Sequence, residues 1–139
     1  MGTPEIQVKR VYDPPEEDDG VRVLVDRLWP RGLTKAHAAI DLWLKDVGPS
    51  LALRKWFNRD PSRWAEFKRR YAEELDALRA RSAAIAALKG AAQSGRVTLL
   101  FGARDAKHNT AVALHQYLLT REQDSQVLEG SRVLEFRES

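Results

Sequence analysis

The stretch "VRVLVD" (21–26) decides the fold class, because apolar residues dominate it and a single acid ends it. A short, nearly continuous apolar run is typical of a strand that is buried on both faces of a sheet. A second run, "VTLLF" (97–101), has the same character, and helical sequence lies between the two. Strands that alternate with helices predict an α/β fold with a largely parallel sheet flanked by helices, in Rossmann-like layering. We expect 21–25 and 97–101 to be parallel neighbours in the interior of that sheet.

Shorter patterns predict the remaining strands. Residues 6–12 alternate between apolar and polar side chains well enough for a first strand, and 40–47 alternate briefly, as in a short strand. The segment 33–39 is a candidate short helix or turn, and "VLEF" (133–136) is a candidate edge strand. We find no internal repeat and no linker, so the prediction is one domain over residues 1–139.

Helices are predicted in the middle and near the end of the chain. Ser50 is suited to cap a helix over 51–57, because its hydroxyl can accept a free N–H group of the first turn. Asp60 and Pro61 form the start signal of the most strongly periodic helix. One face of that helix carries Trp64, Phe67, Tyr71 and Leu75 at steps of three or four residues, which predicts a buried stripe. Two more helices are expected over 82–95 and 110–119.

Composition limits the class of protein. The chain has 139 residues, 43% of them apolar and 31% charged, as in folded soluble domains. It has neither an apolar run long enough for a membrane span nor the apolar centre of a signal peptide near its start, so we expect a cytoplasmic protein without a membrane partner. The absence of cysteine excludes disulfides, thiolate zinc sites and a cysteine nucleophile.

The positive charge is small, but its chemistry is specific. The net charge is +3, and most of the 23 basic residues are arginines. The planar guanidinium group matches carboxylate and phosphate groups and stacks on aromatic rings. A GC-rich genome explains an excess of arginine equally well, so the positions of the arginines must decide between the two interpretations.

Those positions predict a ligand site at one edge of the sheet. In open parallel sheets, ligands bind beyond the carboxyl ends of the strands. The two buried strands are followed by "DRLWPRG" (26–32) and "GARDAKHN" (102–109), so both polar segments are expected at that edge. The second segment precedes a helix, whose free N–H groups favour an anion.

The candidate site residues follow from this placement. The predicted ligand-binding residues are Arg27, Trp29, Arg31, Trp43, Lys45, Arg54 and Asn109, and the candidate catalytic groups are Asp26, Asp105 and His108. Tyr71 and Glu74 lie beside the aromatic side chains of Trp64 and Phe67, from where either is able to reach a pocket. Each candidate also has a structural interpretation: an ion pair between Asp26 and Arg27, a rigid turn or a cis peptide bond at Trp29–Pro30, and a helix cap at Ser50. No metal site is predicted, because zinc spacing is absent and the acidic residues of 14–20 are typical of a solvated turn. The sequence identifies no cofactor.

Several of these segments together resemble a known bacterial family. "VLVDRLWPRG" (23–32), "WLKDVGPS" (43–50) with "LRKWF" (53–57), the pattern DPxxWxxFxxxYxxEL (60–75) and "TLLFGARDAKHNTAVAL" (98–114) resemble the YeaO-like group of the domain-of-unknown-function family DUF488. The resemblance covers residues 5–120 in matching order and implies a small cytoplasmic α/β protein of bacteria, without assigning it a reaction. A longer branch of the family carries a Cys-His-Arg-like motif after the strand that matches 97–101. Residues 102–109 contain no cysteine here, so thiol chemistry does not carry over.

Different classes of function remain open from the sequence. One is a site for a small molecule that carries a phosphate or carboxylate, with or without catalysis. Another is nucleic-acid binding by arginines and aromatic side chains. Some relatives carry a label as transcriptional regulators, but this sequence shows no winged-helix pattern that would support such a role. The third is a protein–protein interaction module. The gathering of the candidate residues at strand ends, rather than along one helix face, favours the small-molecule anion site, and the sequence leaves the oligomeric state open.

Overall fold

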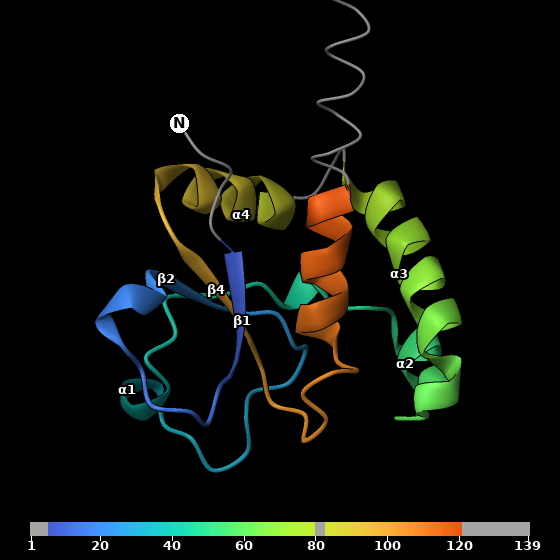
Figure 1. Ribbon diagram of the computed structural model, residues 1–139, viewed down its shortest axis with the longest axis horizontal. Coiled ribbons are helices and arrows are strands. Elements are labelled where there is room, and N and C mark those ends of the chain that lie inside the picture. Colours follow the sequence, from blue (N-terminus) through green and yellow to red (C-terminus); the bar gives the residue numbers. More distant parts are fainter. Residues whose placement is uncertain (1–5, 80–82, 121–139) are drawn as a thin grey trace, which may run out of the picture.

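The sheet of the computed structural model is parallel and has four strands (Figure 1). Residues 6–79 and 83–120 are described, and the predicted edge strand over 133–136 lies outside them. The strands β1 (Ile6–Arg10), β2 (Val21–Leu24), β3 (Leu42–Trp43) and β4 (Val97–Phe101) are arranged in the order β1-β4-β2-β3. Val23 pairs with Leu99 in parallel register, so the prediction that these two strands are interior neighbours is confirmed.

Two predicted strands are shorter than their sequence patterns. β1 ends at Arg10, where a turn begins in which the N–H of Asp13 donates to the Arg10 carbonyl. The alternation over 40–47 produces only the two residues of β3, because Lys45–Val47 form the 3-10 helix η2. Period-2 alternation alone therefore overestimates strand length where a turn follows closely.

The helices lie close to their predicted positions, and one start signal caps a 3-10 helix that precedes its α-helix. They are α1 (Lys35–Ala38), α2 (Leu51–Phe57), α3 (Trp64–Arg79), α4 (Ala83–Ser94) and a helix over 110–120. Ser50 Oγ accepts the N–H of Leu53 at 3.1 Å, as expected of a cap. Asp60 accepts the N–H of Ser62, and Pro61–Arg63 form the 3-10 helix η3, so α3 itself begins later than the start signal.

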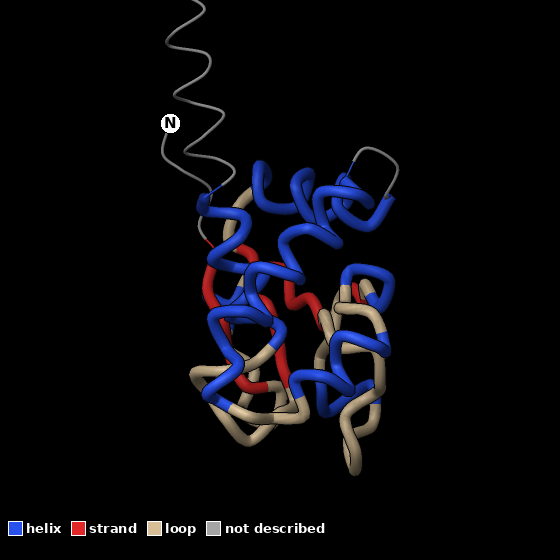
Figure 2. Tube along the Cα trace, turned by 90° about the vertical axis from the view of Figure 1, so that its right-hand side faces the viewer, coloured by secondary structure: helices blue, strands red, loops and turns tan. Residues whose placement is uncertain are grey.

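One face of the sheet carries the large apolar core. Because side chains alternate along a strand, Val23, Val97 and Leu99 point to the same face, where they pack with the buried face of the helices, including Phe67, Tyr71 and Leu75. Phe57 and Phe67 stack there at 4.5 Å between ring centroids. Figure 2, viewed from this side, shows the blue helices in front of the red strands.

The opposite face combines a small apolar cluster with buried charge. Leu24 and Leu100 pack with Val11 and Ala38, whereas Arg22 of β2 is buried beside Asp19 of the 3-10 helix η1 (Glu17–Asp19). The two side chains form an ion pair at 2.5 Å, and Arg22 also donates to the carbonyls of Ala38 and Ala39. The apolar run over 21–25 is therefore buried on both faces, as predicted. Its one charged residue, Arg22, is neutralised by an ion pair with Asp19.

Candidate functional site

The loops that follow β2 and β4 meet at the carboxyl edge of the sheet, the lower edge in Figure 1. Asp26, which follows β2, accepts the N–H of Gly102, which follows β4, at 2.8 Å. The main-chain carbonyl of Asp26 accepts the indole N–H of Trp43 from β3, also at 2.8 Å. Three strand ends are thus joined at Asp26, whereas the sequence placement predicts only that the segments after β2 and β4 lie at one edge.

Two tryptophans form an aromatic wall beside Asp26. Trp29 and Trp43 pack edge to face with ring centroids 5.4 Å apart, and the indole N–H of Trp29 donates to the carbonyl of Leu33. Lys45 Nζ lies 5.1 Å from the centre of the Trp43 ring, a cation–π distance. The Trp29–Pro30 peptide is trans, since the described residues contain no cis peptide bond.

Two arginines reach the same region. Arg27 donates through Nε to the carbonyl of Pro49 at 3.0 Å, just before α2. Arg54, on α2, lies near enough to Asp26 for its positive charge to favour the ionised carboxylate. The Nε atom of Arg54 is buried and has no hydrogen-bond partner. Arg27, Arg54, Trp29, Trp43 and Lys45, gathered around Asp26, are called the edge cluster below.

The carboxylates near the edge cluster accept hydrogen bonds from Gly102 and Ser50 and not from the arginines of the cluster. Asp26 accepts from Gly102, and Glu74 of α3 accepts both the N–H and the hydroxyl of Ser50, at 2.8 and 2.6 Å. Burial raises the pKa of Asp26, and the Gly102 hydrogen bond and Arg54 only partly offset that effect. Among the described residues no ion pair joins Arg27 or Arg54 to a carboxylate, although Arg22, Arg63, Arg69 and Arg70 all have such pairs.

Tyr71 lies beneath the edge cluster and is not part of an open pocket wall. It is buried, and its hydroxyl donates to the carbonyl of Val47 at 2.6 Å. Burial raises the pKa of Tyr71, and the nearby charges of Glu74 and Asp26 raise it further. Tyr71 and Glu74 thus hold the segment that precedes α2 against α3.

The second predicted loop is internally satisfied. Asp105 accepts the N–H groups of Lys107 and His108 through Oδ1, and its Oδ2 lies 2.8 Å from His108 Nδ1. Hydrogen bonds from His108 and Lys107 lower the pKa of Asp105. Asn109 caps the final helix by accepting the N–H of Val112, and the His108 ring packs edge to face on Trp64. Asn109 therefore occupies one of the helix N–H groups that were predicted to hold an anion, that of Val112.

The structure does not bring every predicted residue into the edge cluster. No hydrogen bond or ion pair within residues 6–79 and 83–120 joins Asp105, His108 or Asn109 to it. Arg31 is exposed, and its carbonyl accepts the hydroxyl of Tyr12. The roles predicted for these four residues stay predictions.

Arg10 is a candidate that the sequence reasoning missed. It is the last residue of β1 and pairs with Phe101, directly before Gly102. Its Nε atom is buried without a hydrogen-bond partner, and its guanidinium lies 5.1 Å from the Tyr12 ring centre. The signal was available, because Arg10 falls at the carboxyl end of a predicted parallel strand, but the strand was expected to continue to residue 12.

Comparison with known proteins identifies the family. A family model described as "Inactive DUF488-N3 subclade" matches residues 5–133. The chain belongs to this DUF488 subclade. The resemblance drawn from the sequence motifs is thereby confirmed.

Its relatives extend across distant bacteria. The uncharacterized protein YeaO of Escherichia coli (strain K12) is 42% identical over 113 residues, which cover 81% of this chain and 96% of YeaO. The uncharacterized protein Rv3073c of Mycobacterium tuberculosis (strain ATCC 25618 / H37Rv) shows the same identity over 113 residues, 92% of its length. No solved structure matches the chain.

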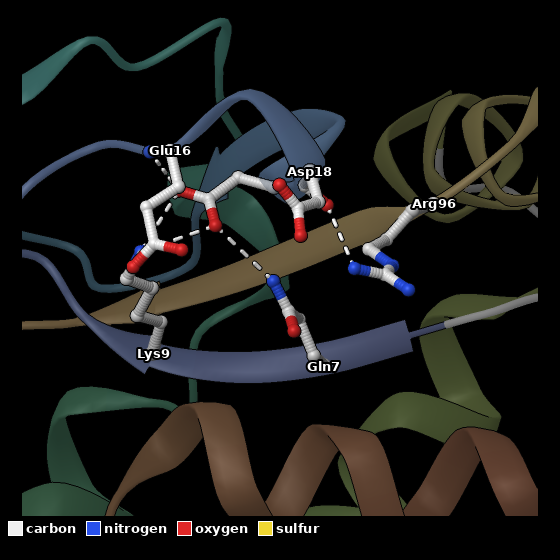
Figure 3. Close-up of a pocket in the computed structure, with 6 residues that line it drawn as sticks. Gln7, Lys9, Glu16, Asp18 and Arg96 are labelled. Atoms are coloured by element: carbon white, nitrogen blue, oxygen red, sulfur yellow. Dashed lines mark hydrogen bonds and ion pairs between the residues drawn. The ribbon is translucent and has the colours of Figure 1, made fainter.

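Figure 3 shows a polar pocket of about 150 Å³, whose lining shares no residue with the edge cluster. It is lined by Gln7, Lys9, Glu16, Asp18, Asp19 and Arg96. Asp19, which is buried, already accepts hydrogen bonds from Lys9, Gln7, Arg22 and the N–H of Glu16. Since these bonds stabilise η1 on the sheet, the pocket has a structural explanation.

The described part of the chain contains no group of three or more His, Asp or Glu residues placed to hold a metal ion. None of the described helices is both long enough and apolar enough to cross a membrane.

Proposed function

We propose that this DUF488 protein binds a small anionic molecule, carrying a phosphate or a carboxylate, at the edge cluster. The observation that carries the proposal is that the buried Nε of Arg54 has no hydrogen-bond partner, while Asp26, on whose carboxylate the charge of Arg54 acts, accepts the N–H of Gly102. A buried donor without a partner is costly, and an anion would satisfy it. Arg27 and Lys45 add positive charge, and neither forms an ion pair with a carboxylate of the described residues.

The proposal is binding without turnover. The subclade is described as inactive, and Asp105 and His108 are bonded to each other and to their own turn. Asp26 supports the Gly102 main chain beside the proposed anion, and we assign it a positioning role in place of the acid–base role predicted from the sequence. Trp29 and Trp43 form one wall of the site and make its occupancy visible by fluorescence.

The test is a titration of phosphate, sulfate, acetate and a mononucleotide against the wild type, followed by tryptophan fluorescence. We expect saturable binding that weakens with added salt, because the attraction is partly electrostatic. Arg54→Gln removes a charge-assisted hydrogen bond and is expected to weaken binding about tenfold or more. Lys55→Gln is the matched control, since Lys55 is exposed on the same helix and is the next residue in the chain.

Equal affinities of the wild type and Arg54→Gln, or no binding of any anion by the wild type, would contradict the proposal. Arg27→Gln serves as a second variant if Arg54→Gln does not fold. A single-stranded oligonucleotide belongs in the same series. Tight, salt-sensitive binding of the oligonucleotide that Arg54→Gln leaves unchanged would favour the nucleic-acid alternative.

A further inference from the structure

Large apolar side chains are exposed around the edge cluster. Within the described residues, Leu28, Leu51 and Trp43 are 73%, 55% and 38% exposed. Single exposed hydrophobic residues are ordinary, but a group of them marks a binding surface.

Hydrogen bonds hold the three segments that carry these side chains together. The indole of Trp43 donates to the carbonyl of Asp26, two residues before Leu28. Arg27, the neighbour of Leu28, donates to the carbonyl of Pro49, two residues before Leu51. The exposed apolar side chains are therefore parts of one rim, which also carries Arg27 and Lys45.

Charge and apolar surface occur together in this rim. Lys45 Nζ lies over the Trp43 ring at 5.1 Å, and Arg27 is adjacent to Leu28 in the chain. A strongly hydrated inorganic anion contacts the cations but leaves Leu28 and Leu51 in water. A ligand with an apolar body removes both leucine side chains from water while its anionic group meets the arginines.

We propose that the ligand of the edge cluster is an amphiphilic organic anion, in which a carboxylate or phosphate monoester is attached to an aliphatic or aromatic body. This inference rests on the proposed anion site and specifies the chemical class of its ligand. The anionic group contacts Arg54 and Arg27, and the apolar body covers Leu28, Leu51 and the exposed part of Trp43.

The experiment measures affinity by calorimetry along two series: inorganic phosphate, butyl phosphate, hexyl phosphate and phenyl phosphate, and acetate, butanoate and hexanoate. The expected result is an affinity that rises about twofold to fourfold for each added methylene, the effect of partial to full methylene burial. The series that gives the tighter binding identifies the headgroup. Hexanol is the uncharged control and is expected to bind far more weakly than hexyl phosphate.

Variants separate the two halves of the site. Leu28→Ser and Leu51→Ser are expected to lower the affinity ratio of hexyl phosphate to inorganic phosphate severalfold, while inorganic phosphate binds as before. Leu119→Ser, which alters an exposed leucine on the helix over 110–120, is the matched control and is expected to change neither affinity. Arg54→Gln is expected to weaken both ligands.

Affinity that does not depend on chain length, with Arg54→Gln still weakening inorganic phosphate, overturns this inference and leaves the anion site standing. Absence of binding by every anion overturns both proposals. Light scattering supplies a further check. A dimer that Leu28→Ser and Leu51→Ser convert to monomer would show that a second copy of the chain covers the rim, and would also overturn the inference.

Discussion

At the scale of single residues, Asp26 and Gly20 show how the backbone geometry of the fold constrains the side chain. Asp26 lies where two strand ends meet, so its carboxylate binds the Gly102 N–H instead of solvent. Gly20 has a φ of +66°, and an added Cβ would lie 2.1 Å from the Arg96 carbonyl oxygen. A hydrogen bond therefore constrains the side chain at Asp26, and the lack of room for a Cβ atom excludes any side chain at Gly20.

Asp26→Asn tests the cost of burying that charge. The folded-state pKa of Asp26 is raised by burial, so this group favours folding most below its unfolded pKa of 3.8, and the benefit is lost as the pH rises through the folded pKa. Asparagine keeps an acceptor for the Gly102 N–H without the charge. We expect the variant to be at least as stable as wild type at pH 7, and the difference to vanish near pH 3, in urea titrations. A variant that is less stable at pH 7 would contradict this pKa direction.

Gly20→Ala tests the close approach of η1 to the start of β4. The substitution combines an unfavourable positive φ with a main-chain clash, so a loss of several kcal/mol is expected. Gly90→Ala, in the middle of α4, is the control, because an added Cβ meets no atom within 4 Å there and alanine is the better helix former. Thermal unfolding should separate the two variants clearly, and similar midpoints would contradict the close approach.

At the scale of secondary-structure elements, α3 connects the hydrophobic core to the edge cluster. Phe67 and Tyr71 pack in a row on its buried face, with ring centroids 5.9 Å apart. Glu74, about one helical turn after Tyr71, holds Ser50 at the start of α2. The position of Arg54 on α2 therefore depends on Glu74 of the following helix, which lies 24 residues after Ser50 in the chain.

Phe67→Ala tests how much the buried face of α3 contributes. Phe67 is almost completely buried between Phe57, Trp64 and Tyr71, so the substitution leaves a cavity. A loss of about 3–5 kcal/mol is expected in denaturant titration. Glu73→Ala changes an exposed side chain of the same helix and should have a much smaller effect. A loss below about 1 kcal/mol for Phe67→Ala would mean that this face does not pack as described.

At the scale of the whole molecule, the two faces of the sheet are stabilised by different physics. The helix face is held by apolar burial, whereas the opposite face depends on Asp19 and its contacts with Lys9 and Arg22. Burial opposes ionisation of Asp19, but hydrogen bonds from Glu16, Lys9 and Arg22 outweigh it and lower its pKa. The face that carries η1 therefore loses the stabilisation from Asp19 in acid.

Asp19→Asn tests this difference between the faces. The variant leaves the buried Arg22 without its ion-pair partner, which is expected to cost about 3–5 kcal/mol at pH 7. Because the folded-state pKa of Asp19 is lowered, its stabilisation is present above 3.8 and is lost as the pH falls through the folded pKa. The difference in free energy of unfolding between wild type and Asp19→Asn, measured by urea titration, should therefore become smaller as the pH falls. Asp18→Asn is the matched control, since Asp18 is the exposed neighbouring acid.

The sequence by itself determined the features that depend on local pattern. The buried runs predicted two parallel interior strands, Ser50 predicted the start of α2, Asp60 predicted a cap that belongs to η3 just before α3, and the motif order predicted the family. These predictions succeed because strand burial, capping and periodicity depend on neighbours within a few residues.

Only the tertiary structure decided which charges meet. Asp26 and Arg27 are adjacent in the chain, yet Asp26 binds Gly102 and Arg27 binds Pro49. Arg22, inside an apolar run, is buried because Asp19 folds back over it, and the loop of Asp105 satisfies its own N–H groups. Each polar group has several possible partners in the sequence, and the one it binds is set by the distance and desolvation that the packed sheet imposes.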